Sequence, residues 1–177
     1  MKFRSILVLA SFAFFSVGSS VVFGQDEAAE RNATAQEITG DWQLLPLPDS
    51  LEPKVLQTNP WPAACQWYSY SSTGTLKSID STPEPCQALS SAKLDEALLQ
   101  VPAVVSWKYD LSPVYQKGLI IVTRSDVQGY SEYWEPHIVT KPFSNGGVKF
   151  QQGDLLLYLF NLQQHQLVWI RHLRKIA

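Results

Sequence analysis

The sequence predicts an all-β domain with one short helix, arranged as an antiparallel meander that closes into a barrel. Three observations predict it: apolar and polar residues alternate over most of the chain after residue 37, hairpin-length turns join the alternating segments, and a single segment has helical spacing. A meander of about nine strands with so few helices either closes into a barrel or forms a sandwich. We favour closure. The 177 residues, 45% hydrophobic and 12% aromatic, suffice for one packed domain.

The N-terminus, residues 1–24, is typical of a secretory signal peptide. Lys2 and Arg4 precede an apolar run, and small residues follow it up to Gly24, where we expect cleavage. An uncleaved anchor is the alternative, because the apolar stretch is nearly long enough to span a bilayer, and it is the one way in which we expect membrane contact. The formal net charge is −2, and loss of Lys2 and Arg4 makes the product more acidic. An acidic, exported protein, periplasmic or secreted, is a poor candidate for nucleic-acid binding.

Cys65 and Cys86 are the only two cysteines in the chain. In an oxidising compartment they are expected to form a disulfide, and two free buried thiols are the alternative. Their spacing matches no zinc-binding pattern.

The elements follow in order from residue 25. Residues 25–37 are polar and predict a flexible linker ahead of a single domain at 38–177. Ile38, Gly40, Trp42 and Leu44 alternate with polar residues, so they predict the first strand. A proline-rich loop then extends to residue 62.

A hairpin is predicted over residues 65–80, with its turn at Thr73-Gly74. A helix follows at 91–101, where Leu94, Leu98 and Val101 share one face. The remaining strands are separated by glycine-containing or polar turns, the strongest being Asn145-Gly146-Gly147. These strands lie at 103–110, 118–124, 130–141, 155–162 and 167–176, with a turn at Gln152-Gly153-Asp154 before the fourth.

Gly40-Asp41-Trp42 lies on the first strand, and the last strand carries two arginines. With these features the two ends of the domain resemble the lipocalin, or broader calycin, pattern. The resemblance implies that Gly40 and Trp42 lie at the closed end of an eight-stranded barrel, and that Arg171 or Arg174 packs across the indole ring. The helix lies in mid-chain rather than after the last strand, which departs from that pattern.

Alternation within the last strand favours Arg171 over Arg174 as the arginine that packs on Trp42. Arg171 shares a face with Trp169 and Leu173, whereas Arg174 shares the other face with His172. A stacked guanidinium and indole gain about 0.5 to 2 kcal/mol. The alternative makes Trp42 ordinary core and leaves both arginines at solvated strand ends.

Aromatic side chains are the main functional signal. If they face one interior they predict a site for a small apolar or amphipathic molecule, with Tyr158 or Glu132 orienting it. If they face outward, they predict a non-enzymatic domain for protein–protein interaction or assembly. The candidate ligand-binding residues are Trp67, Trp107, Tyr109, Trp134, Tyr158 and Trp169.

The sequence contains no catalytic motif that would predict an enzyme. Glu132 and Glu135 are three apart on a strand and therefore point to opposite faces. His137, His165 and His172 are far apart in sequence, so neither a metal site nor a cofactor is predicted.

Overall fold

The computed structural model describes residues 28–51, 65–81, 86, 89–103, 105–111, 119–125, 129, 131–161 and 166–176. Of residues 81, 110, 111 and 119–125 only the backbone is described. The predicted signal peptide, its cleavage position, most of the proline-rich loop and His165 lie outside the described residues.

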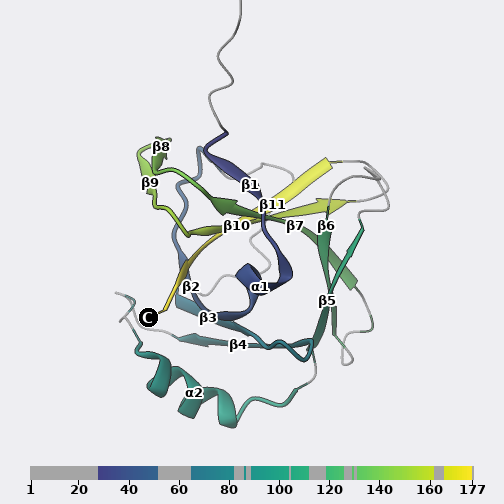
Figure 1. Cartoon of the computed structure of the whole chain (residues 1–177). Coiled ribbons are helices and arrows are strands. Elements are labelled where there is room, and N and C mark those ends of the chain that lie inside the picture. Colours follow the sequence, from purple (N-terminus) through teal and green to yellow (C-terminus); the bar gives the residue numbers. More distant parts are fainter. Residues whose placement is uncertain are drawn as a thin grey trace, which may run out of the picture.

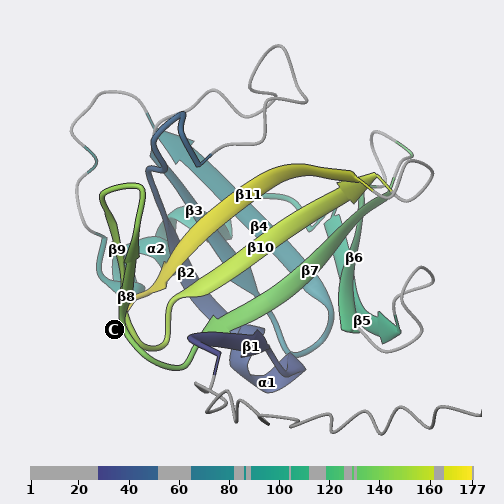
Figure 2. The same ribbon diagram turned by 90° about the horizontal axis from the view of Figure 1, so that it is seen from above.

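The described part of the chain is mostly antiparallel β-structure, as predicted, and it contains two helices (Figures 1 and 2). Helix α1 covers Ala35–Ile38 and α2 covers Ser91–Leu99. The predicted helix at 91–101 is thus confirmed, but the expectation of a single helix was wrong. The strands are β1 (Glu30–Asn32), β2 (Gly40–Leu45), β3 (Cys65–Tyr70), β4 (Thr75–Ser81), β5 (Val105–Leu111), β6 (Leu119–Ser125), β7 (Ser131–Val139), β8 (Phe143–Asn145), β9 (Val148–Phe150), β10 (Leu155–Asn161) and β11 (Gln166–Lys175).

The large sheet has the strand order β1-β7-β10-β11-β2-β3-β4-β5-β6, and β6 also pairs with β7. Strand β7 is shared: β10 lies along one of its edges, while β6 pairs with residues 131–134 and β1 with residues 137–139 along the other. The pairing of β4 with β5 is short and joins Thr75 to Ser106 and Leu76 to Val105. The meander is confirmed by these pairings, and its closure into a barrel stays a prediction.

One face of the sheet, called the inner face below, carries the main hydrophobic core. In Figure 1 the strands of the sheet surround α1, whose Ile38 is fully buried. Alternation along each strand directs every second side chain to this face, as a half-buried strand requires. Its buried members are Ala33, Ile38, Trp42, Tyr68, Tyr70, Leu76, Trp107, Trp134, Ile138, Leu155, Leu157, Trp169 and Leu173.

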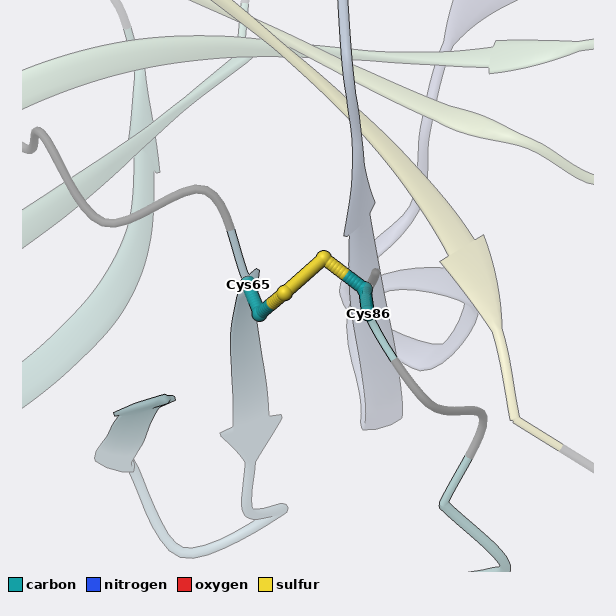
Figure 3. The surroundings of a disulfide bond; sticks show 2 residues. All are labelled: Cys65 and Cys86. Carbon is teal, nitrogen blue, oxygen red and sulfur yellow. A yellow bond between two sulfur atoms is a disulfide. The ribbon is translucent and has the colours of Figure 1, made fainter. Parts of the chain in front are cut away.

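The opposite face, the outer face, is covered by two smaller units. Helix α2 packs Leu94 and Leu98 against Trp67 and Cys65 of β3, and it runs below β4 in Figure 1. The predicted disulfide joins Cys65 to Cys86 with a Cα–Cα distance of 5.3 Å (Figure 3). The β8–β9 hairpin supplies Phe150 to a second cluster with Val139 and Leu156.

The segment before the first long strand is folded, so the prediction of a flexible linker at 25–37 was wrong for its second half. Thr34 caps α1 and Glu37 returns a hydrogen bond to the Thr34 backbone, which forms a capping box. Glu37 also forms an ion pair with Arg31 at 2.6 Å. Among the described residues of this segment, Ala33 and Ile38 are the buried apolar ones, and they lie against the end of the inner face. That end is called the α1 end below.

Candidate binding site on the inner face

Arg171 is a charged residue within the inner-face core. Its side chain points from β11 and is 5% exposed. The guanidinium carbon lies 4.1 Å from the ring centroid of Trp134 and 4.9 Å from that of Tyr68. Aromatic ring faces attract a guanidinium, and the attraction is strongest where water is excluded. Strands β3, β7 and β11 therefore bring one buried cation between two aromatic rings.

Polar groups continue from Arg171 toward the end of the sheet away from α1, called the far end. Glu132 Oε2 accepts a hydrogen bond from Trp134 Nε1 at 3.0 Å. The Tyr68 hydroxyl donates to Gln66 Oε1. Because directly paired residues share a face, Ser78 and Asp80 lie beside Tyr68 and Gln66, and both are exposed. The inner face is thus apolar toward α1 and more polar toward the far end.

Tyr70, whose ring packs edge-on against Trp107, carries an unpaired hydroxyl. The residue is 1% exposed, and its Oη has no hydrogen-bond partner. Burial raises the pKa of Tyr70 well above its ordinary value, and the charge of Arg171 opposes that rise. An unpaired buried hydroxyl costs about 1 to 3 kcal/mol. A donor without an acceptor therefore lies within electrostatic reach of the guanidinium.

At the α1 end, Trp42 is held by contacts with α1 and β11. Its side chain is fully buried, and Nε1 donates to the Ile38 carbonyl of α1 at 2.7 Å. The cation over its ring is Lys175, whose Nζ lies 5.3 Å from the centroid. Lys175 therefore takes the position that we expected for Arg171, because β11 pairs with β2 in a register that sets Lys175 opposite Trp42.

The backbone conformation at position 40 favours glycine. The φ of Gly40 is +127°, and an added Cβ would lie 3.0 Å from Lys175 Cε. A side chain at this position would press on the lysine that covers Trp42.

Four of the six predicted ligand-binding residues lie on the inner face. Trp107, Trp134 and Trp169 are buried there, and Tyr109 packs against the same cluster. Trp107 and Tyr109 are near the α1 end, where the Tyr109 hydroxyl donates to the Ala33 carbonyl. Trp134 and Trp169 are the pair nearer to the far end, on the strands that carry Glu132 and Arg171.

The other two predicted residues point away from the interior. Trp67 lies between inward-facing Gln66 and Tyr68 on β3, so its ring packs under α2 instead. Tyr158 packs in the cluster below the β8–β9 hairpin and donates to Glu30 Oε2 at 2.9 Å. Assigning them to the interior was wrong, because neighbours on a strand point to opposite faces. Glu132 keeps its predicted place beside Trp134.

Two charged clusters on the outer face were missed by the sequence analysis. In the first, His137 Nε2 lies 2.9 Å from Glu135 Oε1 and Nδ1 lies 3.8 Å from Glu30 Oε1. Burial opposes the charge of His137, but the hydrogen bonds and charges of Glu135 and Glu30 prevail and raise its pKa to about 9. This cluster fastens β1 to β7. The alternation Glu135-Pro136-His137 was the available signal, but Glu30 is remote in sequence.

In the second cluster, Asp154 is the common acceptor. His172 Nε2 lies 2.7 Å from its Oδ2, and Arg174 donates to both oxygens at 2.9 and 2.8 Å. Burial raises the pKa of Asp154, but the hydrogen bonds of His172, Arg174 and the Gln151 backbone outweigh it and lower the pKa to about 2. The alternation in the last strand already placed His172 and Arg174 on one face. It could not include Asp154, because that residue comes from the turn before β10.

The described residues offer no metal site and no membrane-spanning helix. They contain no group of three or more metal-ligating side chains and no helix long and apolar enough to cross a bilayer. The disulfide fits an oxidising, exported environment.

Comparison of the chain with protein-family models, with curated proteins and with solved structures gives no match.

Proposed function

We propose that this chain is an exported binding module with a lipocalin-like barrel, and that it holds a small apolar or amphipathic molecule against its inner face. One observation carries the proposal. The inner face combines aromatic rings, which favour an apolar body, with a few converging polar groups around Arg171. Sites for small molecules commonly have this composition.

Strand pairing supports closure into a barrel. From β2 the pairings lead through β3, β4, β5 and β6 to β7, and from there through β10 and β11 back to β2. An antiparallel barrel of about eight strands has an interior just large enough for side chains or for one small ligand. The stacking of Lys175 on Trp42 beside α1 supports a floor of the kind that the lipocalin resemblance implies.

The orientation of the aromatic residues favours a ligand over a protein partner. Trp42, Trp107, Trp134 and Trp169 lie in the inner-face cluster. Among the described residues the one exposed large hydrophobic side chain is Leu99, at 77% exposure. Protein-binding surfaces usually present a contiguous apolar patch, and a single leucine does not make one.

An assembly domain with a filled β core is the second candidate. Trp42 and Trp134 are fully buried, which is also what a filled interior would produce. The two candidate functions differ in whether the inward-facing side chains leave room in the interior for a ligand.

Tryptophan fluorescence and thermal unfolding would test the proposal. We expect a fatty acid, a retinoid or a tetrapyrrole to change the emission saturably and to raise the melting temperature. Trp169→Phe, on the inner face, should weaken this response, whereas Trp67→Phe, under α2, should leave the affinity unchanged. If no probe raises the melting temperature and a crystal structure shows the interior filled, the assembly domain replaces the binding module.

Export is the second part of the proposal, and the Cys65–Cys86 bridge supports it. Protein recovered from outside the cytoplasm should begin near Gln25, one residue after the expected cleavage at Gly24. An intact N-terminus on correctly exported protein would instead indicate an uncleaved anchor.

A further inference from the structure

The N-terminal strap, residues 28–38, is attached to the sheet by few apolar contacts. It consists of β1, which lies beside the end of β7, and of α1 (Figure 2). Its buried apolar side chains are Ala33 and Ile38, and its other side chains are half-buried or exposed. A segment with few buried apolar contacts is the kind that opens locally, before the core unfolds.

Backbone hydrogen bonds hold the strap along one short stretch of β7. Strand β1 pairs with residues 137–139. Beyond this pairing, the Ala33 amide donates to the Pro136 carbonyl and the Thr140 amide donates to the Ala29 carbonyl, each at 2.8 Å. Such bonds add only modestly to stability, because water replaces them when the strap opens.

Glu30 is the charged side chain of the strap that reaches the sheet. The other two charged side chains, Arg31 and Glu37, form an ion pair with each other. Glu30 Oε2 accepts a hydrogen bond from the Tyr158 hydroxyl at 2.9 Å, and its Oε1 lies 3.8 Å from His137 Nδ1. One carboxylate thus ties the strap to both β7 and β10.

His137 supplies the positive charge at this contact. Its ring lies between Glu30 on β1 and Glu135 on its own strand, and edge-on against Tyr158 on β10. Burial opposes the charge, but the two carboxylates raise the pKa of His137 to about 9. Burial and the charge of Glu30 raise the pKa of Tyr158, so its hydroxyl keeps its proton. Once His137 loses its proton, the two carboxylates repel each other with no cation between them.

We propose that the N-terminal strap opens while the rest of the domain stays folded, and that the contact of Glu30 with His137 and Tyr158 is the latch that keeps it closed. Opening frees the edge of β7 at residues 137–139. It also removes the Ile38 carbonyl, which accepts the hydrogen bond of the Trp42 indole. The strap is thus a conformational device of the fold, and it operates with or without a ligand.

Native-state proteolysis with trypsin would measure this opening. Arg31 is the only lysine or arginine in the strap, and it is paired in β1, so trypsin cleaves after it only when the strap is open. Mass spectrometry separates this cleavage from cuts elsewhere in the chain. Where closing is faster than cleavage, the rate follows the population of the open form. We expect the rate to rise with urea much less steeply than global unfolding does, because opening exposes little surface.

Two variants weaken the latch. His137→Gln should speed cleavage after Arg31 about tenfold at neutral pH, because it removes the cation between the carboxylates. Tyr158→Phe removes only the hydroxyl that binds Glu30 and should speed cleavage about threefold. In the unmodified protein the rate, divided by that of a free peptide of residues 28–38, should rise about tenfold between about pH 8 and 10. His137→Gln should abolish this rise.

Two controls destabilise the domain outside the strap. His172→Gln makes the same change as His137→Gln, but in the cluster of Asp154. Cys65→Ala/Cys86→Ala removes the bridge between β3 and the segment before α2. Each should lower the urea midpoint of global unfolding and leave cleavage after the strap arginine, measured without urea, within about twofold of the unmodified rate.

The outcomes decide both parts of the proposal. A shallow urea dependence, with acceleration by His137→Gln and no effect of the two controls, supports the latched strap. Cleavage that the controls accelerate in proportion to their loss of global stability overturns it, because the strap then unfolds together with the core. Local opening that His137→Gln does not accelerate also overturns it, because the latch would then be absent.

Discussion

Arg171 and Arg174 are three residues apart on β11 and lie on opposite faces of the sheet, where they are stabilised in different ways. Arg174 is 36% exposed and makes a two-point ion pair with Asp154 on the outer face. Arg171 is 5% exposed and lies between the rings of Trp134 and Tyr68. The outer cation is paired with the carboxylate of Asp154, and the inner cation lies over two aromatic ring faces. The outer cluster is expected to stabilise the fold, and under the proposed function the inner one belongs to the binding site.

Asp154→Asn should give the largest loss of stability. The substitution keeps the shape of the side chain but removes the charge that His172 and Arg174 share. Removing one partner of a buried ion pair typically costs about 3 to 5 kcal/mol, which urea unfolding would measure.

Arg174→Met is the matched control for Asp154→Asn. It removes the half-exposed partner and should cost about 1 kcal/mol or less. If Asp154→Asn costs no more than this control, the outer cluster does not stabilise the fold as described.

Loss of the Cys65–Cys86 bridge should have the next largest effect, because the bridge anchors the segment that leads into α2. A closed loop of this length contributes about 3 kcal/mol by the chain-entropy estimate. Cys65→Ala/Cys86→Ala should therefore unfold at lower urea concentration by that amount. A double variant as stable as the unmodified protein, or two alkylatable thiols in freshly exported protein, would contradict the role of the bridge.

The fold was more predictable from the sequence than the site, and particular residues show why. Alternation and glycine turns suffice to locate the β3–β4 hairpin and the turn between β8 and β9. They do not predict β1 and α1, because the order of that segment comes from remote partners such as His137 and Pro136. Ile38 continues the alternation of β2 and was assigned to that strand, yet it ends α1.

For the site, alternation groups Arg171 with Trp169 and Leu173 but does not say which indole ring lies opposite. That choice depends on the register between strands, which sets Lys175 rather than Arg171 across from Trp42. Register is a tertiary property, and no local signal in the chain specifies it.

The pH dependence of stability should come from the outer clusters and have two limbs. Asp154 has a folded pKa lowered to about 2, so its contribution is complete above the unfolded value near 4 and is lost as the pH falls toward 2. His137 has a folded pKa raised to about 9, so its contribution is complete below the unfolded value near 6.5 and is lost as the pH rises through 9. Each limb should be on the order of 2 kcal/mol.

Urea midpoints measured from pH 2 to 10 would check both limbs. His137→Gln should flatten the alkaline limb. Asp154→Asn should remove the part of the acid limb that belongs to Asp154 and leave the parts from Glu30, Glu37 and Glu135, whose pKa values are also lowered. An alkaline limb that survives His137→Gln would assign the loss to another group.

The smallest expected effect concerns the rings around Arg171. A double-mutant cycle on Arg171→Met and Trp134→Leu should give a coupling of about 1 kcal/mol, since the guanidinium lies 4.1 Å from the Trp134 centroid. The same cycle on Arg171→Met and Trp42→Leu should be nearly additive, because Lys175 covers Trp42. Stronger coupling to Trp42 than to Trp134 would contradict the stacking.

The contrast between the two faces is tested most directly by the indole N–H signals of the protein in a two-dimensional ¹H–¹⁵N NMR spectrum during titration with dodecanoic acid. Trp134 and Trp169 lie on the inner face beside Arg171, whereas Trp67 lies on the outer face under α2 and serves as an internal control. We expect the signals of Trp134 and Trp169 to shift saturably at a common affinity while the signal of Trp67 stays in place. Shifts of Trp67 alone, or no shift of any indole at saturating dodecanoic acid, would contradict a ligand site on the inner face.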